Sequence, residues 1–517
     1  MSTARGSLRR GMLYTAVVVL LGMLPGIAVR TQAQAPGDKA VYGSSGVTFS
    51  TAYIDASGYS PQGTDICLTL QNILTGTMFN NTSGAVIDAR GINSGQAQSC
   101  SVDPWGTFPT SSGRWTTPAT ILLPAGTITI QHTWIIPNFS RIVGEGPGVT
   151  TLAAASNFQS DLDGINAMVE LGSTYSAATS CNGAYCFCGG SASGNPADCV
   201  GVGVRDLTLD ASAYTGSSQL IGVENQASQE LTFVDHVAFN DSPSSAQAHG
   251  LLGLNVNSYN STNASRNICL PASSRPSECS SNNSGPYSSL TFTAGSDAGS
   301  DAQCAAITGM AGIRGIHGLT CTTASSSTGA GITLDGDNTT IEDVYVNGFA
   351  DGIHVGGATY ATQADVLLNI TGGTSVTNLI YIDSASSAAA GSSNCPTLTP
   401  ANPNTTPDVC DLSILHATSG ANNTINDQIT GALLSNSSDP FVAMYALGEN
   451  LVPASGSIAQ YSRYTTSPSQ PNWSIGNTSP ASGASCTTNG SLYSNTSTSS
   501  TTGTLFACVA SQWVKVD

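Results

Sequence analysis

The sequence predicts an all-β fold, a single-stranded right-handed parallel β-helix in which short strands stack as successive coils of a solenoid. Charged residues make up only 9% of the 517 residues, against about 25% in an ordinary soluble domain. That scarcity excludes a coiled coil, a long exposed helix or a charged tail. Hydrophobic residues make up 40%, too many for a disordered chain. Helical periodicity is almost absent, and two β-strand patterns recur along the chain.

The N-terminus has the features of a secretory signal peptide covering residues 1–35. Arg5, Arg9 and Arg10 precede an apolar stretch, and residues 33–35 (Ala-Gln-Ala) match a small-residue cleavage site. A retained membrane anchor is the alternative, because the apolar stretch approaches the ~20 residues needed to span a bilayer. Cleavage would remove four of the 14 basic residues and none of the 32 acidic ones, which changes the net charge from −18 to −22.

All 14 cysteines follow the predicted cleavage site. An even number of cysteines in a secreted chain predicts disulfides. Residues 181–199 hold four of them and offer a zinc site as the alternative, but their spacing lacks paired Cys-x-x-Cys motifs, so no metal site is expected. Short separations in the sequence favour three local disulfides: Cys269–Cys279, Cys395–Cys410 and Cys486–Cys508.

One segment, residues 65–74, shows helical periodicity. Its apolar residues share one face, Thr64 is placed to cap the N-terminus and Gly76 follows the C-terminus. The sequence therefore predicts one short helix before the first coils.

The first recurring pattern is apolar–x–polar–apolar–x–apolar–Asp/Asn, and it occurs at residues 204–210, 234–240 and 341–347. In stacked coils its polar residue falls at a bend between sheets, where Asp or Asn tolerates left-handed backbone angles. The residues expected at these bends are Asp206, His236 and Asp343.

The second pattern is Gly–apolar–x. If the apolar residue points inward, the third residue points outward on the same sheet. Copies at successive coils then place their third residues in one outer ladder, which is expected to contain Arg314, Thr333 and His354, with Glu224 further along.

Several N-terminal segments together resemble the entrance of the pectate-lyase-like right-handed parallel β-helix superfamily. They are residues 54–58, 63–66, 84–91, 121–127 and 142–146. The resemblance covers roughly residues 40–450, and it implies that the helix at 65–74 caps the open end of the solenoid. It implies no single activity, because the superfamily includes lyases, hydrolases, epimerases, phage tailspikes and adhesins.

Composition shifts divide the chain further. Ser/Asn-rich, cysteine-containing stretches are interpreted as loop insertions, and a Pro/Ser/Gly-rich stretch near the end is interpreted as a linker. The expected parts are a signal peptide at 1–35, the cap and first coils at 36–155, the β-helix at 156–460 with insertions at 180–200, 242–330 and 385–410, a linker at 461–485, and a small β module at 486–517.

Residues 349–354 (Phe-Ala-Asp-Gly-Ile-His) resemble the Asn-Thr-Asp-Gly-Ile-Asp strand of the polygalacturonase family. The resemblance implies a catalytic role for Asp351. The Asn-Thr pair and the downstream Gly-His-Gly and Arg-Ile-Lys motifs of that family are missing.

An inverting hydrolase needs a second carboxylate about 6.5–9.5 Å from the first, which Asp335 or Asp337 is placed to supply. A lyase needs a base and neutralisation of the uronate charge. Arg314 is the basic residue best placed for that reaction, and His354 completes the set of catalytic candidates. Substrate-binding candidates are Glu224, Thr333, Trp105 and Trp115, the tryptophans as sugar-stacking rings.

The expected function is therefore that of a secreted polysaccharide-active protein, a glycoside hydrolase or a polysaccharide lyase acting on an extracellular polysaccharide in a groove along the solenoid. The alternatives are a non-catalytic surface adhesin or carbohydrate-binding scaffold, and a tailspike-like receptor-binding protein. No cofactor is required, although a lyase would use Ca²⁺. The acidic composition excludes nucleic acid as a partner, and no further segment is apolar enough for an integral membrane protein.

Overall fold

The computed structural model divides the chain into two units, Met1–Ser45 and Gly46–Asp517. All residues described below lie in the second unit. They are residues 53–59, 65–74, 84–105, 118–160, 165–172, 199–226, 228, 231–257, 284–308, 315–324, 329–335, 339–356, 362–383, 409–420, 423–428, 432–435, 441–447, 473–476, 484–486, 492–495 and 505–516.

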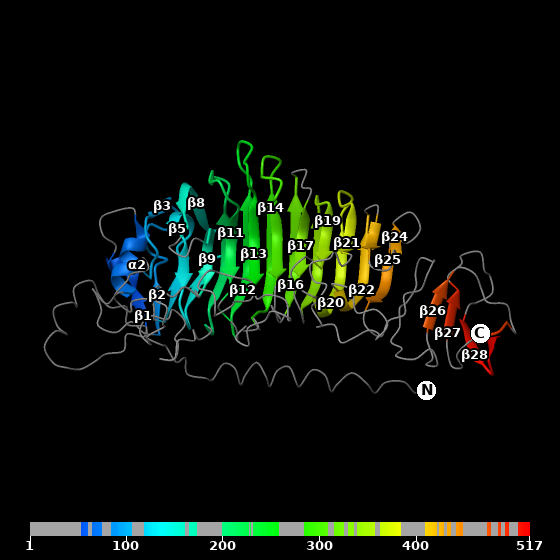
Figure 1. The fold of residues 1–517 in the computed structure, drawn as a ribbon. Coiled ribbons are helices and arrows are strands. Elements are labelled where there is room, and N and C mark those ends of the chain that lie inside the picture. The colour runs from blue at the N-terminus through cyan, green and yellow to red at the C-terminus, as the bar shows by residue number, and fades with distance from the viewer. Residues whose placement is uncertain are drawn as a thin grey trace, which may run out of the picture. The chain divides into compact units, whose positions relative to one another are not determined.

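Two large sheets are built by coils that contribute a strand to each in turn (Figure 1). The 15-stranded sheet A contains β1 (Tyr53–Asp55), β2 (Ala85–Asp88), β3 (Gln98–Cys100), β4 (Ala119–Leu122), β5 (Gly126–His132), β7 (Arg141–Val143), β8 (Thr150–Gln159), β10 (Gly203–Asp210), β12 (Phe233–Asp241), β14 (Tyr287–Ala294), β16 (Ile316–Thr323), β18 (Thr340–Asn347), β20 (Thr362–Gly372), β22 (Val409–Ser419) and β25 (Phe441–Leu447).

The 10-stranded sheet B contains β6 (Trp134–Ile136), β9 (Ala167–Leu171), β11 (Leu220–Asn225), β13 (Leu251–Asn257), β15 (Gln303–Thr308), β17 (Ala330–Asp335), β19 (Asp351–Val355), β21 (Asn378–Ile382), β23 (Asn423–Asp427) and β24 (Ala432–Ser435). Neighbouring strands pair in parallel throughout both sheets, except that β25 and β24 pair antiparallel at the C-terminal ends. The predicted parallel β-helix is confirmed.

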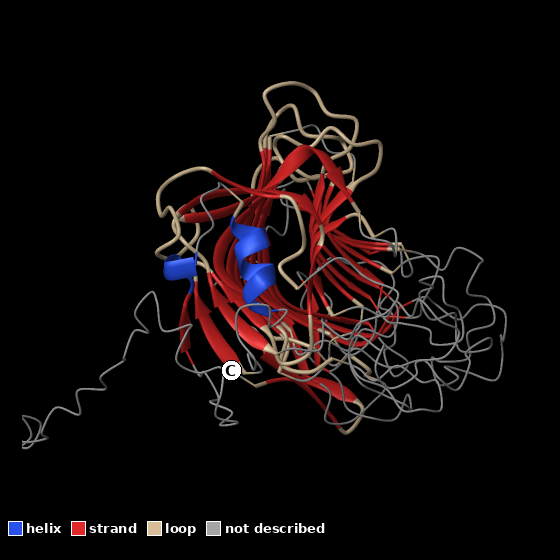
Figure 2. Ribbon diagram, turned by 90° about the vertical axis from the view of Figure 1, so that its left-hand side faces the viewer, coloured by secondary structure: helices blue, strands red, loops and turns tan. Residues whose placement is uncertain are grey.

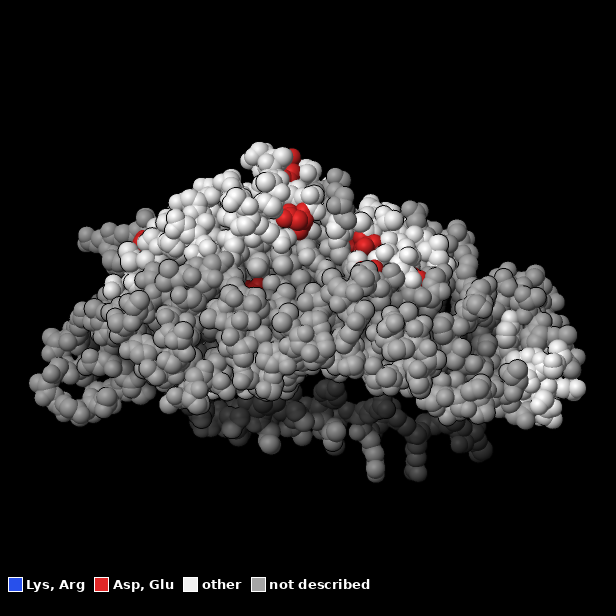
Figure 3. All heavy atoms as spheres, in the orientation of Figure 1, with Lys and Arg blue, Asp and Glu red and all other residues white. Residues whose placement is uncertain are grey.

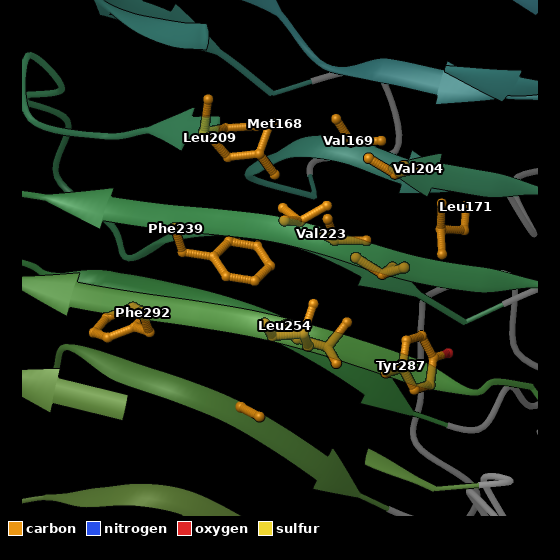
Figure 4. Close-up of a cluster of buried hydrophobic side chains, with 14 of the residues drawn as sticks. Met168, Val169, Leu171, Val204, Leu209, Val223, Phe239, Leu254, Tyr287 and Phe292 are labelled. Atoms are coloured by element: carbon orange, nitrogen blue, oxygen red, sulfur yellow. The ribbon is translucent and has the colours of Figure 1, made fainter. Parts of the chain in front are cut away.

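The core lies between the sheets and is filled by alternate residues of each strand. Val204, Val234 and Tyr287 occupy one register position on three neighbouring strands of sheet A, and all three side chains are buried. Phe239 and Phe292 occupy a second such position, and Figure 4 shows both rings in the apolar cluster between the strands. Burial of these side chains is the main favourable contribution to the stability of the stack.

The left-handed backbone predicted at the bends of the first pattern is confirmed, but these bends lie within strands β10, β12 and β18 of sheet A and not between sheets. Asp206, His236 and Asp343 have left-handed φ angles of 57°, 53° and 54°. The residues on either side of them pair in register, so these bends stack from coil to coil. Polar side chains link neighbouring bends: His236 Nδ1 lies 2.8 Å from Asp206 Oδ1, and Asn369 Nδ2 donates to Asp343 Oδ1 at 2.6 Å.

Helix α2 (Ile66–Leu74) follows the short 3₁₀ helix η2 (Ala56–Tyr59) and lies across the N-terminal end of the stacked strands (Figure 2). The prediction of Thr64 as its N-cap is wrong. Asp65 Oδ1 accepts hydrogen bonds from the backbone N–H groups of Cys67 and Leu68, which are the unpaired donors of the first turn. A disulfide joins Cys67 to Cys100 of β3 and ties the cap to the first coils.

The prediction that residues 242–330 interrupt the repeat is wrong for the described residues. This stretch contributes β13, β14, β15 and β16, which continue both sheets. Strands β14 and β16 carry Ser and Thr at outward positions, and this composition conceals their alternating apolar positions. A buried disulfide, Cys304–Cys321, joins β15 of sheet B to β16 of sheet A inside this stretch.

The C-terminal residues form a separate four-stranded sheet of β26 (Trp473–Gly476), β27 (Leu492–Asn495), β28 (Leu505–Val509) and β29 (Gln512–Lys515). Strand β26 falls inside the predicted linker at 461–485, so that interpretation is wrong for residues 473–476. The predicted disulfide Cys486–Cys508 is confirmed. The ring of Tyr493 contacts those of Phe506 and Trp513 edge-on.

Disulfides in the described residues indicate an oxidising compartment, either extracellular or periplasmic. Cys199 is also disulfide-bonded, so its thiolate is not a ligand for zinc. The predicted signal peptide and the predicted pairs Cys269–Cys279 and Cys395–Cys410 lie outside what the structure describes. Among its described helices, none is long and apolar enough to cross a membrane.

Asp241, the last residue of β12, is fully buried. Its Oδ2 accepts a hydrogen bond from the backbone N–H of Leu251 at 2.8 Å, while Oδ1 is buried without a hydrogen-bond partner. The pKa of Asp241 is raised to about 6, with burial as the largest cause; the hydrogen bond from Leu251 opposes the rise, and the nearby carboxylates of Asp210 and Asp301 add to it. The folded protein therefore binds a proton here more tightly than the unfolded chain does.

We expect Asp241→Asn to stabilise the protein above pH 6. The raised pKa stabilises the folded protein fully below the unfolded pKa of about 3.8, and this stabilisation is lost as pH rises through about 6. The free energy lost is on the order of 2–3 kcal/mol. The amide stays neutral, so the variant should melt at a higher temperature at pH 8, with a smaller advantage at pH 4. Thermal melts across this range, with Asp343→Asn as control, measure the effect. An equal advantage at both pH values would contradict it.

Candidate functional site

The outer face of sheet B carries the candidate site. The register places Thr333 of β17, His354 of β19 and Tyr381 of β21 side by side, with Asn426 of β23 next in the same ladder. A second ladder on this face runs from Asp351 to Asn378 and Asn423. Strand neighbours are about 4.8 Å apart, so side chains from three adjacent coils can act on one bound molecule.

A glycine allows Asp351 and His354 to share this face although they are three residues apart. Gly352 and Ile353 are both buried, so the strict alternation of a strand is broken between the two polar residues. A Cβ at Gly352 would lie 2.5 Å from the backbone oxygen of Leu379 on the next coil. Only glycine fits this close backbone approach.

His354 lies between two carboxylates. Its Nδ1 is 3.3 Å from Asp351 Oδ2, and its Nε2 is 3.7 Å from Asp383 Oδ2. Asp383 directly follows β21. The side chains of His354 and Asp383 are 27% and 28% exposed, so both reach solvent. The Asp351 carboxylate also accepts a hydrogen bond from Asn378 at Oδ1, so both of its oxygens have partners.

The two carboxylates raise the pKa of His354 above its ordinary value. The hydrogen bond that the His354 ring donates to Asp351 is the largest cause, burial opposes it, and the charges of Asp351 and Asp383 add to it. The His354 ring also contacts the Tyr381 ring, with centroids 4.9 Å apart. Burial and both carboxylates raise the pKa of the Tyr381 hydroxyl. The site thus places an imidazole that holds its proton more tightly than usual beside a carboxylate and an aromatic ring.

The structure brings together three of the predicted site residues: Asp351, His354 and Thr333. Thr333 pairs in register with His354, and its hydroxyl accepts a hydrogen bond from Gln303. Asp335 ends β17 and is only 5% exposed. The register places Asp335 on the coil before β19 and Asp383 on the coil after it, so the two carboxylates belong to coils on opposite sides of β19.

Glu224 belongs to the same outer ladder as His354, as predicted, but lies four strands away, a distance of about 19 Å. It is 2% exposed and accepts a hydrogen bond from Asn255. Trp105 is fully buried in the N-terminal core. The expectation that Trp105 stacks on a sugar is therefore wrong, because its ring has no exposed face. Arg314, Asp337 and Trp115 lie outside the described residues. Ala306 of β15 holds the ladder position before Thr333, so the predicted place of Arg314 in this ladder is wrong.

The sequence interpretation missed Asp383, Tyr381 and Asn378. Leu379 replaces the glycine at this coil, so the Gly–apolar–x pattern does not find the strand. The signal that remains is spacing: Asn378 follows Asp351 by 27 residues, and a shift of the same length aligns Tyr381 with His354. No group of three or more His, Cys, Asp or Glu side chains in the described part of the chain is placed to hold a metal ion.

No family model matches the chain, and no curated protein matches it. Solved structures similar to it include the A-module of the mannuronan C-5 epimerase AlgE4 of Azotobacter vinelandii, which is 14% identical, covers 61% of this chain and 81% of its own, and has a TM-score of 0.21. Another is ORF18 of Geobacillus virus E2, which is 12% identical, covers 90% of this chain and 86% of its own, and has a TM-score of 0.26. We draw no conclusion on activity from either match.

We expect Asp351→Asn to lower the pKa of His354, because the hydrogen bond that the ring donates to the Asp351 carboxylate is the largest cause of its rise and burial opposes it. The ring-proton shifts of His354, followed by NMR from pH 5 to 9, measure this pKa. Asp343→Asn, which removes an exposed carboxylate from a sheet A bend, is the matched control. An unchanged titration in Asp351→Asn would show that Asp351 does not hold the proton on His354.

Proposed function

We propose that this protein is a secreted glycoside hydrolase that acts on an extracellular polysaccharide at the outer face of sheet B. The observation that carries the proposal is the placement of the His354 imidazole between Asp351 and Asp383, with His354 and Asp383 open to solvent. Hydrolysis of a glycosidic bond needs a proton donor for the leaving oxygen and a carboxylate that activates water or attacks the anomeric carbon. The site offers one group for each role.

In this reaction His354 is the general acid. Asp351 holds Nδ1, which orients the ring and leaves Nε2 facing Asp383 and solvent. The proton of Nε2 passes to the glycosidic oxygen as the bond to the anomeric carbon breaks. The 3.7 Å between Nε2 and Asp383 Oδ2 leaves no room for a water between acid and base, so Asp383 attacks the anomeric carbon and forms a glycosyl-enzyme intermediate. The neutral His354 then takes a proton from the water that hydrolyses this intermediate and frees the Asp383 carboxylate. Tyr381 is placed to contact the sugar ring beside the cleaved bond.

Charge favours hydrolysis of an uncharged polymer over elimination on a polyuronate. The described basic residues are Arg90, Arg141, Arg205 and Lys515, and none of them belongs to a sheet B strand. A uronate carboxylate bound beside His354 would meet Asp351 and Asp383 without a described Arg or Lys to neutralise it. The charged atoms that Figure 3 shows on one face of the described molecule are likewise acidic.

A non-catalytic carbohydrate-binding face is the second candidate function. The observation that favours it is that both oxygens of Asp351 are already hydrogen-bonded, one to His354 and one to Asn378. Amides, carboxylates and a partly exposed tyrosine on one face also suit hydroxyl recognition without chemistry. Binding of a polysaccharide without release of new chain ends would select this candidate.

We expect the purified protein to release reducing ends from at least one neutral polysaccharide of a panel. His354→Gln and Asp383→Asn should each lower kcat at least 100-fold, because acid–base groups contribute about 10²–10⁴-fold. Asp343→Asn on sheet A is the charge-matched control and should keep full activity. A parallel ultraviolet assay for unsaturated products distinguishes a lyase. Full activity in both site variants would exclude this site as the catalytic centre.

The pH dependence of kcat/KM gives a separate test of the acid role. A general acid works only while protonated, so kcat/KM should fall as pH rises through the raised pKa of His354. Asp351→Asn should move this alkaline fall to lower pH, since the carboxylate no longer favours the charged ring. An alkaline limb that stays in place in Asp351→Asn would contradict the assignment of the acid to His354.

A further inference from the structure

Amide side chains continue the hydrogen-bond network of the site onto the next two coils. Asn378 Nδ2 donates to Asp351 Oδ1 at 2.7 Å. Asn378 Oδ1 accepts hydrogen bonds from Nδ2 of Asn423 at 3.0 Å and from Nδ2 of Asn426 at 3.2 Å. Gln428 in turn donates to Asn426 Oδ1. Asn378 is 8% exposed, so its amide depends on these protein partners rather than on water.

This pattern permits a single orientation of the Asn378 amide. An amide has one accepting oxygen and one donating nitrogen. If the Asn378 amide were reversed, its oxygen would face the Asp351 carboxylate, and its N–H groups would face the N–H groups of Asn423 and Asn426. Both contacts would be repulsive. The acceptor-only carboxylate of Asp351 therefore fixes the Asn378 donor towards it, and the N–H groups of Asn423 and Asn426 satisfy the Asn378 oxygen on the other side.

We propose that Asn378 is a positioning residue, which fixes the Asp351 carboxylate so that its second oxygen faces His354, and that the amides of β23 are part of the same functional site. The contact between Asp351 and His354 is 3.3 Å long, so a small rotation of the carboxylate would weaken it. The hydrogen bond from Asn378 to the other oxygen prevents that rotation. The effect on activity rests on the proposed hydrolase function, whereas the effect on His354 can be measured without it.

Sheet A supplies a matched control for this contact. Asn369 Nδ2 donates to Asp343 Oδ1 at 2.6 Å, the same pair of groups on neighbouring strands. Asn369 has a left-handed φ of 56°, so glycine is the replacement that removes its side chain without backbone strain. Asn369→Gly thus deletes an equivalent hydrogen bond away from His354.

The test compares Asn378→Ala with Asn369→Gly. NMR titration of the His354 ring should show a lower pKa in Asn378→Ala than in the parent, because the freed carboxylate turns from the ring. On a cleaved polymer, kcat should fall about 10-fold with KM changed less than about twofold, a part of the 10²–10⁴-fold contribution of an acid–base group. Asn369→Gly should leave the titration, kcat and KM unchanged.

Circular dichroism checks whether Asn378→Ala folds, and a second variant keeps the proposal testable if it does not. Asn426→Ala keeps Asn378 but removes one of the donors that orient it, and its His354 pKa should fall by less. If Asn378→Ala does not fold, the His354 pKa measured in Asn426→Ala decides whether Asn378 has a positioning role. A His354 pKa that is unchanged or higher overturns the positioning role. If the parent cleaves no polymer, the hydrolase function fails while the titration still decides the role of Asn378.

Discussion

In-register parallel stacking of the coils is the constraint on which the rest of this structure depends. Each coil repeats the backbone of the one before it at a spacing of about 4.8 Å, so equivalent residues form ladders along both sheets. Apolar residues in the inner ladders fill the core, as Val204, Val234 and Tyr287 do. The outer ladders bring together residues far apart in the sequence. Because of this stacking, Asp351, Asn378 and Asn423 make one surface.

The same constraint explains the scarcity of charge. A charged residue repeated in an outer ladder would face its own kind at the distance of a strand neighbour, where like charges are destabilising. Neutral Thr, Asn and Ser avoid that repulsion at most outer positions, and the pair of Glu170 and Glu224 is an exception. The acids at the bends have polar partners of another kind. Asp206 contacts His236 of the next coil, and Asp343 accepts from Asn369. A low charge content is therefore a consequence of the repeat.

Much of the fold could be predicted because its determinants are local. The polar residue of the first pattern marks a left-handed bend at Asp206 and His236 in the structure, since few side chains tolerate that conformation. The stretch at 242–330 was harder, because its strands carry Ser and Thr outside and long connections between them. The helix cap was missed by one residue, because Asp65 also accepts hydrogen bonds from Ser101, which directly follows β3, a contact that local sequence does not encode.

The candidate site likewise combines residues that the local sequence predicts with residues that only the register of the coils brings together. The chain segment around Gly352 encodes Asp351 and His354 locally, so the sequence predicted both. Asp383 and Asn378 belong to the next coil, and only the register brings them to the site.

The hydrogen bond from Asn378 changes the role expected of Asp351. Its resemblance to a catalytic aspartate suggests direct chemistry, yet one oxygen is held by Asn378 and the other faces His354. A carboxylate bound on both sides suits orientation of a neighbour better than attack on a substrate. The exposed pair of His354 and Asp383, assembled from two coils, is then the part of the site free to act on a sugar.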